Sequence, residues 1–204
     1  MTFKLIADAL ANDGFCISPR FLATAAVAAL ARDAHANRSR FQPAGVGEGE
    51  RHALRPQVRG DSTLWIEPPG QSSAQRTVLA RFEALRLALN RALQLGLFDF
   101  ECHFALYPPA AGYRRHLDRF TGRDSSAGER ARVLSCVLYL NREWGPEDRG
   151  QLRLYRPGAA PLDIPPQGGT LVTFLSDRFE HEVVPARRER LSLTGWFRRR
   201  AAQR

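Results

Sequence analysis

Three side chains combine residue types and spacings that suit a bound metal ion: His116, Asp118 and His181. His116 and Asp118 are two residues apart, and residues i and i+2 of a β-strand point to the same face. This imidazole and this carboxylate could therefore converge on one ion. A His-x-Asp pattern alone arises by chance in many chains, but here it gains weight from His181, which follows an expected strand and the loop at residues 176–180.

Two histidines and one carboxylate leave three coordination positions of a metal open, which is the arrangement of non-haem Fe(II) oxygenases. A structural zinc site fits less well, because cysteines usually close such a site and the three cysteines of this chain have no paired spacing. The remaining histidines lack a partner at ligand spacing, and we interpret them as surface or core residues: His35, His52 and His103.

An arginine after the last histidine suggests a site for an anion. Arg190 lies nine residues beyond His181, across an expected turn at residues 186–189, which predicts that it lies on the next antiparallel strand. A buried arginine there offers a planar fork for a carboxylate. Ser192 follows two residues later on the same face, so the pair could form a pocket for a dicarboxylate co-substrate. Without the metal ligands, Arg190 would be interpreted as one more surface arginine.

The elements that must position these residues change in character along the chain. Periodic apolar residues predict helices over 2–12, 19–34 and 74–96, the last ended by Gly96, with short strands at 15–17 and 62–67 between them. After Gly96 the expected elements are short strands rich in β-branched and aromatic residues: 98–107, 132–140, 151–155, 169–174, 181–184 and 190–197. Helices followed by a run of short strands predict an α+β chain that ends in an antiparallel barrel or sandwich.

One segment has no periodic pattern. Residues 38–61 contain a glycine-rich stretch at 44–50 that we expect to be flexible. A loop of this length inside a compact domain is usually either functional or disordered.

The composition limits the class of protein. The 204 residues, 44% of them hydrophobic and 25% charged, are typical of one globular domain. The formal net charge of +9 would suit a nucleic-acid-binding protein, but Lys4 is the only lysine, and an arginine bias also fits a GC-rich bacterial genome. A solvated basic surface is therefore the preferred interpretation, and binding to nucleic acid is not expected.

No apolar run approaches the roughly 20 residues of a transmembrane helix, and the N-terminal residues lack the pattern of a secretory signal. Three unpaired cysteines imply no disulfide framework. We therefore expect a soluble cytoplasmic protein with reduced thiols and no membrane partner.

The ordered pattern of His116-x-Asp118, His181 and Arg190-x-Ser192 resembles the signature of the 2-oxoglutarate and Fe(II)-dependent dioxygenases. Within them it is most similar to the prolyl 4-hydroxylase superfamily, in particular to bacterial relatives of the oxygen-sensing (HIF-type) prolyl hydroxylases. The resemblance extends over roughly residues 38–198 and includes these segments: 59–61, 65–67, 107–108, 112–118, 138–141, 150–154, 176–178, 181–183 and 194–197.

The resemblance implies a fold and a division of the chain. The fold would be a double-stranded β-helix, a cupin-like jelly roll, with N-terminal supporting helices. Residues 1–97 would hold the helices, the finger loop and supporting strands, residues 98–200 the catalytic core of the same structural unit, and residues 201–204 a tail.

The resemblance also implies a role for each site residue. His116, Asp118 and His181 would hold Fe(II), and Arg190 would pair with the distal carboxylate of 2-oxoglutarate. Other residues would line the co-substrate pocket: Tyr107, Tyr139, Ser192 and Thr194. The substrate side would contain the loop 38–61, which closes over a bound peptide, and the following residues: Arg59, Asp61, Tyr113 and Trp196.

The activity implied is hydroxylation of a prolyl residue in a protein, using Fe(II), 2-oxoglutarate and O₂ and releasing succinate and CO₂, with ascorbate (vitamin C) as a candidate addition. Two alternatives remain: the same oxygenase chemistry on another side chain, a free amino acid or a nucleobase, or a non-enzymatic binding module. The positive charge permits a protein of the translation machinery as the target but does not identify it. Nothing in the sequence demands more than a monomer.

The chain departs from this family in two loops. The segment 38–61 is rich in glycine and arginine and differs from that of the animal enzymes, so the same protein substrate is not implied. The loop at 122–132 is a few residues longer and is predicted to contact substrate differently.

Overall fold

The computed structural model describes residues 2–47, 53–118 and 130–200, which form two antiparallel sheets and three helices. The larger sheet has the strand order β1-β9-β6-β11-β4-β3-β2. Its strands are β1 (Phe15–Ser18), β2 (Gln42–Pro43), β3 (Ser62–Ile66), β4 (Asp99–Tyr107), β6 (Arg130–Tyr139), β9 (Leu171–Leu175) and β11 (Arg190–Arg200).

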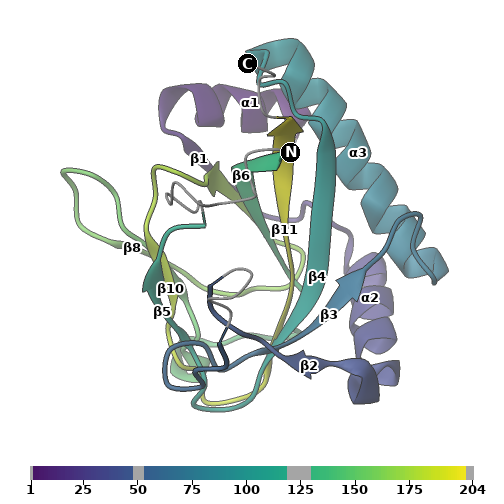
Figure 1. The fold of residues 1–204 in the computed structure, drawn as a ribbon, viewed down its shortest axis with the longest axis vertical. Coiled ribbons are helices and arrows are strands. Elements are labelled where there is room, and N and C mark those ends of the chain that lie inside the picture. The colour runs from purple at the N-terminus through teal and green to yellow at the C-terminus, as the bar shows by residue number, and fades with distance from the viewer. Residues whose placement is uncertain (1, 48–52, 119–129, 201–204) are drawn as a thin grey trace.

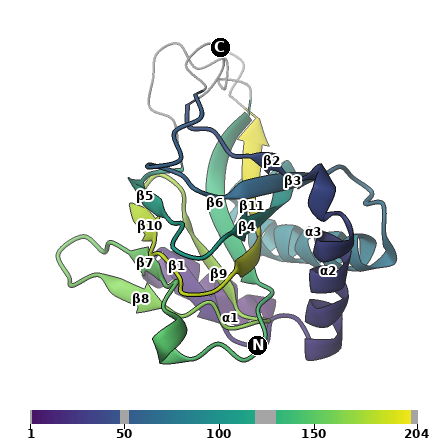
Figure 2. The ribbon, with the colours of Figure 1, turned by 90° about the horizontal axis from the view of Figure 1, so that it is seen from below.

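The smaller sheet has the order β5-β10-β7-β8 and faces the larger one (Figure 2). Its strands are β5 (Tyr113–His116), β7 (Leu152–Leu154), β8 (Leu162–Ile164) and β10 (His181–Val183). Two short 3₁₀ turns, Arg38–Arg40 and Pro146–Asp148, complete the elements. The two facing antiparallel sheets and the supporting helices confirm the predicted α+β double-stranded β-helix.

Three helices cover the side of the larger sheet that faces away from the smaller one (Figures 1 and 2). They are α1 (Phe3–Asn12), α2 (Thr24–Ala36) and α3 (Ser73–Leu93). The prediction was wrong at two ends. Helix α2 begins at Thr24 rather than residue 19, because Arg20 adopts a positive φ of 55° in the turn after β1. Helix α3 ends at Leu93, because Gln94 and not Gly96 takes the left-handed position that caps it.

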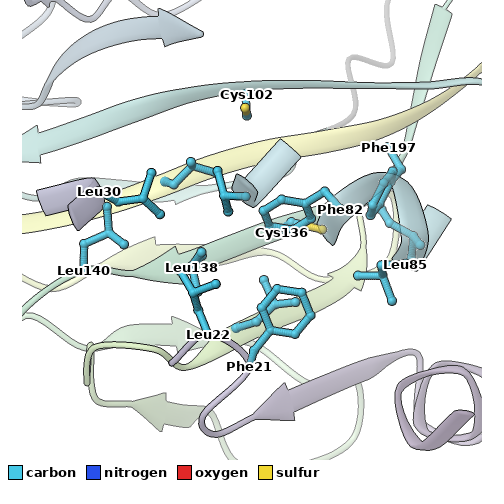
Figure 3. Packing of buried hydrophobic residues seen from close by; sticks show 14 of the residues in the cluster. Phe21, Leu22, Leu30, Phe82, Leu85, Cys102, Cys136, Leu138, Leu140 and Phe197 are labelled. Atoms are coloured by element: carbon cyan, nitrogen blue, oxygen red, sulfur yellow. The ribbon is translucent and has the colours of Figure 1, made fainter. Parts of the chain in front are cut away.

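Alternation along the central strands builds two cores. Cys102 of β4 and Cys136 of β6 point outward and pack with helical residues such as Phe82 (Figure 3). Phe104 of β4 belongs to the same cluster. The intervening residues point inward, between the sheets, as expected for the period of two of a strand. The inner cluster contains Ala105, Tyr107, Val137, Tyr139, Val172, Phe174 and Leu154. The inward-pointing set includes the residues of the candidate site.

The strand topology corrects two expectations about the site. Strand β5 ends at His116, so Asp118 lies in a bend after the strand and not on the same strand face. Strand β11, which carries Arg190, pairs with β4 and β6 in the larger sheet, whereas β10, which carries His181, pairs with β5 and β7 in the smaller sheet. The two residues therefore come from facing sheets and not from adjacent strands.

The segment 38–61 is more regular than its sequence indicated. Gln42 and Pro43 pair with β3, the Ala44 N–H donates to the Asp61 carbonyl at 2.9 Å, and Val46 pairs with Ala53. Part of the stretch expected to be flexible, residues 48–52, lies outside the described residues, as do most of the loop at 122–132 and the tail at 201–204. Within the described parts of the chain, no helix is long and apolar enough to span a membrane.

Candidate active site

A cavity of about 590 Å³ lies between the two sheets and is partly covered by residues 40–47. Strands of both sheets line it, together with the segment that precedes β3. Ten of the twelve residues assigned to the site from the sequence line this cavity: Arg59, Asp61, Tyr107, Tyr113, His116, Asp118, His181, Arg190, Thr194 and Trp196. The other two, Tyr139 and Ser192, are fully buried inner-face residues of β6 and β11, which pair with each other.

The three predicted metal ligands converge. Their ligand atoms all lie within 4.8 Å of one another, and they are the one group of this kind among the described residues. The Nε2 atom of His116 lies 3.6 Å from Oδ1 of Asp118, and Nε2 of His181 lies 3.6 Å from Oδ2. One metal ion could be reached by both imidazoles and the carboxylate at once. The spacing of two residues in the sequence does bring His116 and Asp118 together, even though the strand has ended between them.

Backbone carbonyls set the orientation of both imidazoles. Nδ1 of His116 lies 2.8 Å from the carbonyl oxygen of Arg114, and Nδ1 of His181 lies 3.2 Å from that of Phe179. A carbonyl only accepts, so each Nδ1 carries the proton and each Nε2 keeps its lone pair for a metal. A hydrogen bond of this kind fixes the tautomer and the ring orientation of metal-binding histidines.

The charges of the three groups also suit a cation. Burial by itself raises the pKa of Asp118, but His181, His116 and the hydroxyl of Ser135 outweigh it and hold that pKa well below its usual range. Burial lowers the pKa of His181 to about 4, against the attraction of Asp118. At neutral pH Asp118 is therefore a carboxylate and His181 a neutral imidazole, and these are the protonation states that bind a metal.

Arg190 lies at a second position in the cavity and is only 1% exposed. Its Nε donates to the carbonyl of Gly150 at 2.9 Å, but Nη2 has no hydrogen-bond partner. No carboxylate of the described residues lies within ion-pair distance of this guanidinium. A buried cation with an unpaired N–H is costly unless an anion completes it. The position therefore fits a carboxylate ligand, as the sequence predicted.

Two tyrosines surround this guanidinium. The centre of the guanidinium lies 5.3 Å from the ring centroid of Tyr107 and 5.2 Å from that of Tyr139. The hydroxyl of Tyr139 has no partner, and burial raises the pKa of Tyr139 to about 12 against the opposing effect of Arg190, so this hydroxyl remains a neutral donor. A carboxylate at Arg190 could accept from both groups.

The two remaining predicted co-substrate residues contact each other. The hydroxyls of Ser192 and Thr194 lie 3.3 Å apart on the inner face of β11. Thr194 reaches the cavity and Ser192 is enclosed beside Tyr139, so only Thr194 is placed to contact a ligand directly.

The residues predicted for the substrate side form a chain of contacts toward the metal ligands. Arg59 makes a two-pronged ion pair with the buried Asp61, with N–O distances of 2.8 and 3.1 Å. Its guanidinium also lies 4.9 Å from the ring centroid of Tyr113, which stacks on His116 at 3.6 Å between centroids. Arg59 therefore joins the end of the segment 38–61 to a candidate metal ligand.

The opposite wall of the cavity is aromatic. Trp196 packs under Arg132, whose guanidinium lies 3.6 Å from its ring centroid, and Trp65 of β3 is 47% exposed. Both tryptophans contact the buried ring of His103. The distance between ring centroids is 4.7 Å for Trp65 and 5.5 Å for Trp196.

The sequence did not identify three residues near the site: His103, Arg132 and Ser135. For His103 a signal existed, because strand alternation places it on the same face as the predicted site residue Tyr107. Ser135 gave no spacing signal, because its partner Asp118 is separated from it by 17 residues.

Comparison with known proteins gives the family. Residues 102–198 match the family model described as the 2OG-Fe(II) oxygenase superfamily. The crystal structure of a Pseudomonas putida prolyl-4-hydroxylase superposes with a TM-score of 0.87 at 47% identity, over 97% of this chain and 99% of that one. The chain belongs to the 2-oxoglutarate and Fe(II)-dependent oxygenase superfamily. Fe(II), 2-oxoglutarate and O₂ are the cofactor and co-substrates of this superfamily, and the donor set and the unpaired Arg190 fit the first two.

Two other relatives are similar over most of this chain. A Trichoplax adhaerens prolyl hydroxylase, solved with a hypoxia inducible factor peptide fragment, superposes with a TM-score of 0.80 at 27% identity, over 96% of this chain and 88% of that one. Human Egl nine homolog 1 is 31% identical over 150 residues. Those residues make up 69% of this chain but only 33% of the human protein, so the chain spans about a third of that relative.

Proposed function

We propose that this oxygenase hydroxylates a prolyl residue of a protein substrate, consuming 2-oxoglutarate and O₂ and releasing succinate and CO₂. The observation that carries the proposal is a single cavity that could bind a metal ion with an anionic co-substrate at one part and a substrate chain at another. One part contains three metal ligands and an unpaired arginine, and the other contains an aromatic wall that reaches the exposed Trp65. The similarity to prolyl hydroxylases supports a prolyl substrate.

In this proposal His116, Asp118 and His181 hold Fe(II), and Arg190 with Tyr139 binds the distal carboxylate of 2-oxoglutarate. Tyr107 and Thr194 line the space between these groups. The bound iron would supply the reactivity toward O₂ and an unactivated C–H bond. The carbonyls of Arg114 and Phe179 orient the two histidine ligands. Tyr107 and Val137 keep water from the buried end of the cavity.

Tyr113 and Trp196 are proposed to flank the reacting residue, and Arg59 with Asp61 to hold the segment 38–61 over it. We further propose that the enzyme acts as a monomer in the cytoplasm of a bacterium, with ascorbate sustaining turnover. A target in the translation machinery is consistent with the formal net charge of +9. The same chemistry on a nucleobase is the second candidate, which the arginines Arg40, Arg59 and Arg132 around the cavity favour.

The roles of the metal ligands can be tested without the protein substrate. Under anaerobic conditions, Fe(II) plus 2-oxoglutarate should give the wild-type enzyme a weak visible absorption band. His116→Ala and Asp118→Ala should abolish the band, because two ligands hold iron poorly. Thr173→Val removes a buried hydroxyl of the larger sheet that does not line the cavity, and it should keep the band. An unchanged band in both ligand variants would contradict the metal assignment.

The prolyl substrate is tested in a protein extract of the native host from which the gene has been deleted. Adding wild-type enzyme with Fe(II), 2-oxoglutarate and ascorbate should add the mass of one oxygen atom to a prolyl residue, detected by peptide mass spectrometry. Asp118→Ala is the matched control and should leave that peptide unmodified. Enzyme-dependent oxidation of a nucleobase, with no modified prolyl peptide, would favour the second candidate.

A further inference from the structure

His103 is a buried polar side chain that neither coordinates the candidate metal position nor contacts Arg190. It lies on β4, paired with Trp65 of β3 on one side and with Thr194 of β11 on the other. Its side chain lines the cavity, it is only 2% exposed, and neither of its ring nitrogens has a hydrogen-bond partner. Buried polar groups are nearly always paired, so two unpaired nitrogens on one ring point to a missing partner.

The protonation state of His103 narrows the chemistry of that partner. Burial, helped by the charges of Arg59 and Arg132, lowers the pKa of His103 to about 3 against the opposing effect of Asp118. The neutral ring has one N–H donor and one acceptor nitrogen. This combination matches a neutral group that itself accepts and donates, such as a peptide unit, and gives no advantage to a phosphate or a carboxylate.

The position of His103 separates it from the proposed 2-oxoglutarate site. Arg190 pairs with Tyr107, and His103 lies four residues before Tyr107 on the same strand. At about 3.3 Å per residue this places the two backbone positions about 13 Å apart. The partner of His103 is therefore a different ligand from the one that Arg190 binds.

The surroundings of His103 also favour a polypeptide. Its ring lies against both Trp65 and Trp196, and the indole N–H of Trp196 is a second buried donor without a partner. Trp65 continues this wall to the surface, where 47% of the residue is exposed. Aromatic walls with a few fixed polar groups are typical of sites that bind an extended ligand and set its orientation.

We propose that His103 is a specificity-determining residue that hydrogen-bonds a backbone peptide group of the protein substrate, beside the prolyl residue that reacts. Trp65 packs against the part of the substrate chain that leads out of the cavity. This inference rests on the proposed function, and it adds the contact that would select a polypeptide over a free amino acid. His103 would then act on substrate affinity and not on the binding of 2-oxoglutarate.

The test uses a synthetic peptide with the sequence around the prolyl residue that the extract experiment identifies. His103→Leu removes both nitrogens at similar volume and should raise the peptide KM roughly tenfold or more, because the substrate group is left unpaired. The co-substrate KM, that for 2-oxoglutarate, should change less than twofold. His103→Asn and His103→Gln place an amide near Nδ1 and Nε2, and one of them should restore the peptide KM to within threefold of wild type.

Controls separate a binding role from a structural one. Thr173→Val removes an equally buried, unpaired hydroxyl outside the cavity and should leave both KM values unchanged. If His103→Leu does not fold, Trp196→Phe removes the other unpaired N–H and should raise the peptide KM several-fold. If His103→Leu folds and its peptide KM stays within twofold of wild type, the proposed role of His103 is contradicted, but the proposed function is not. An extract without any modified prolyl peptide contradicts the proposed function, and this inference with it.

Discussion

The hydroxyl of Ser135, on β6, donates a hydrogen bond of 2.6 Å to Oδ2 of Asp118. A second hydroxyl, that of Ser176, lies 2.9 Å from Ser135 and can donate to it. Asp118 lies in a bend beyond the end of β5, so no strand ladder fixes its carboxylate. Asp118 follows a strand of the smaller sheet, and Ser135 belongs to the larger sheet. Their hydrogen bond therefore fixes the carboxylate against the larger sheet.

Removing this contact should weaken metal binding. Ser135→Ala leaves the three ligands in place but frees the carboxylate to rotate, and changes of this kind typically reduce metal affinity by roughly tenfold or more. The dissociation constant of Mn(II), measured by titration of the metal-free enzyme, should rise by that factor. Ser135→Thr, which keeps the hydroxyl, is the matched variant. Equal constants for Ser135→Ala and wild type would show that Asp118 needs no such support.

Arg190→Lys tests the fork of the guanidinium. Lysine keeps the charge but cannot present two parallel N–H groups to a carboxylate. Loss of one hydrogen bond to a charged group costs about 2 kcal/mol, so the co-substrate KM should rise roughly thirtyfold. Mn(II) affinity without 2-oxoglutarate is the companion measurement and should stay near wild type. A normal co-substrate KM in Arg190→Lys would place 2-oxoglutarate elsewhere.

The ion pair between Arg59 and Asp61 should behave as a buried pair, because the side chain of Asp61 is fully covered and that of Arg59 is only 18% exposed. Arg59→Met leaves the carboxylate buried and unpaired, and should lower the free energy of unfolding by about 3 kcal/mol. The double variant Arg59→Met/Asp61→Leu should recover most of this loss in urea unfolding. Additive losses from the two single changes would mean that the charges do not interact.

The stability of the metal-free enzyme should fall as the pH is lowered from 6.5 to 5. His103 and His181 have folded-state pKa values of about 3 and about 4, whereas an unfolded histidine has about 6.5. Below pH 6.5 the unfolded state binds protons that the folded state does not, so each group removes about 1.4 kcal/mol per pH unit. The loss continues until the pH reaches the folded-state pKa values.

Urea unfolding at pH 7, 6 and 5 measures this slope. His103→Gln, which does not titrate in this range, should show a slope smaller by the contribution of one group. A slope in the variant equal to that of wild type would mean that folding does not lower the pKa of His103.

The three candidate metal ligands could be grouped from the sequence because they depend on local spacing and on a donor set with few chemical uses. His116 and Asp118 remain neighbours whether or not the strand continues between them, so the error about the end of β5 did not affect the prediction. His181 and Arg190, which the sequence also assigned to the site, line the same cavity although they lie in facing sheets. Both are brought to the cavity from opposite sides.

The contacts that were missed depend on pairings between distant parts of the chain. Strand alternation shows that His103 shares a face with Tyr107, but it does not show that this face borders a cavity instead of the apolar core. Ser135 and Asp118 meet because β6 of the larger sheet faces the segment that follows β5 of the smaller sheet. Such partners are set by sheet topology, which local periodicity does not specify.

Hydroxylation of the identified prolyl peptide under isotopically heavy O₂ is the sharpest test of the proposed reaction. Wild-type enzyme should place one heavy oxygen atom on the prolyl residue and one in succinate, in equal amounts, and Asp118→Ala should produce neither. Succinate that forms in step with the peptide while the label appears on a different residue, or while the peptide stays unlabelled, would contradict prolyl hydroxylation as the function of this site.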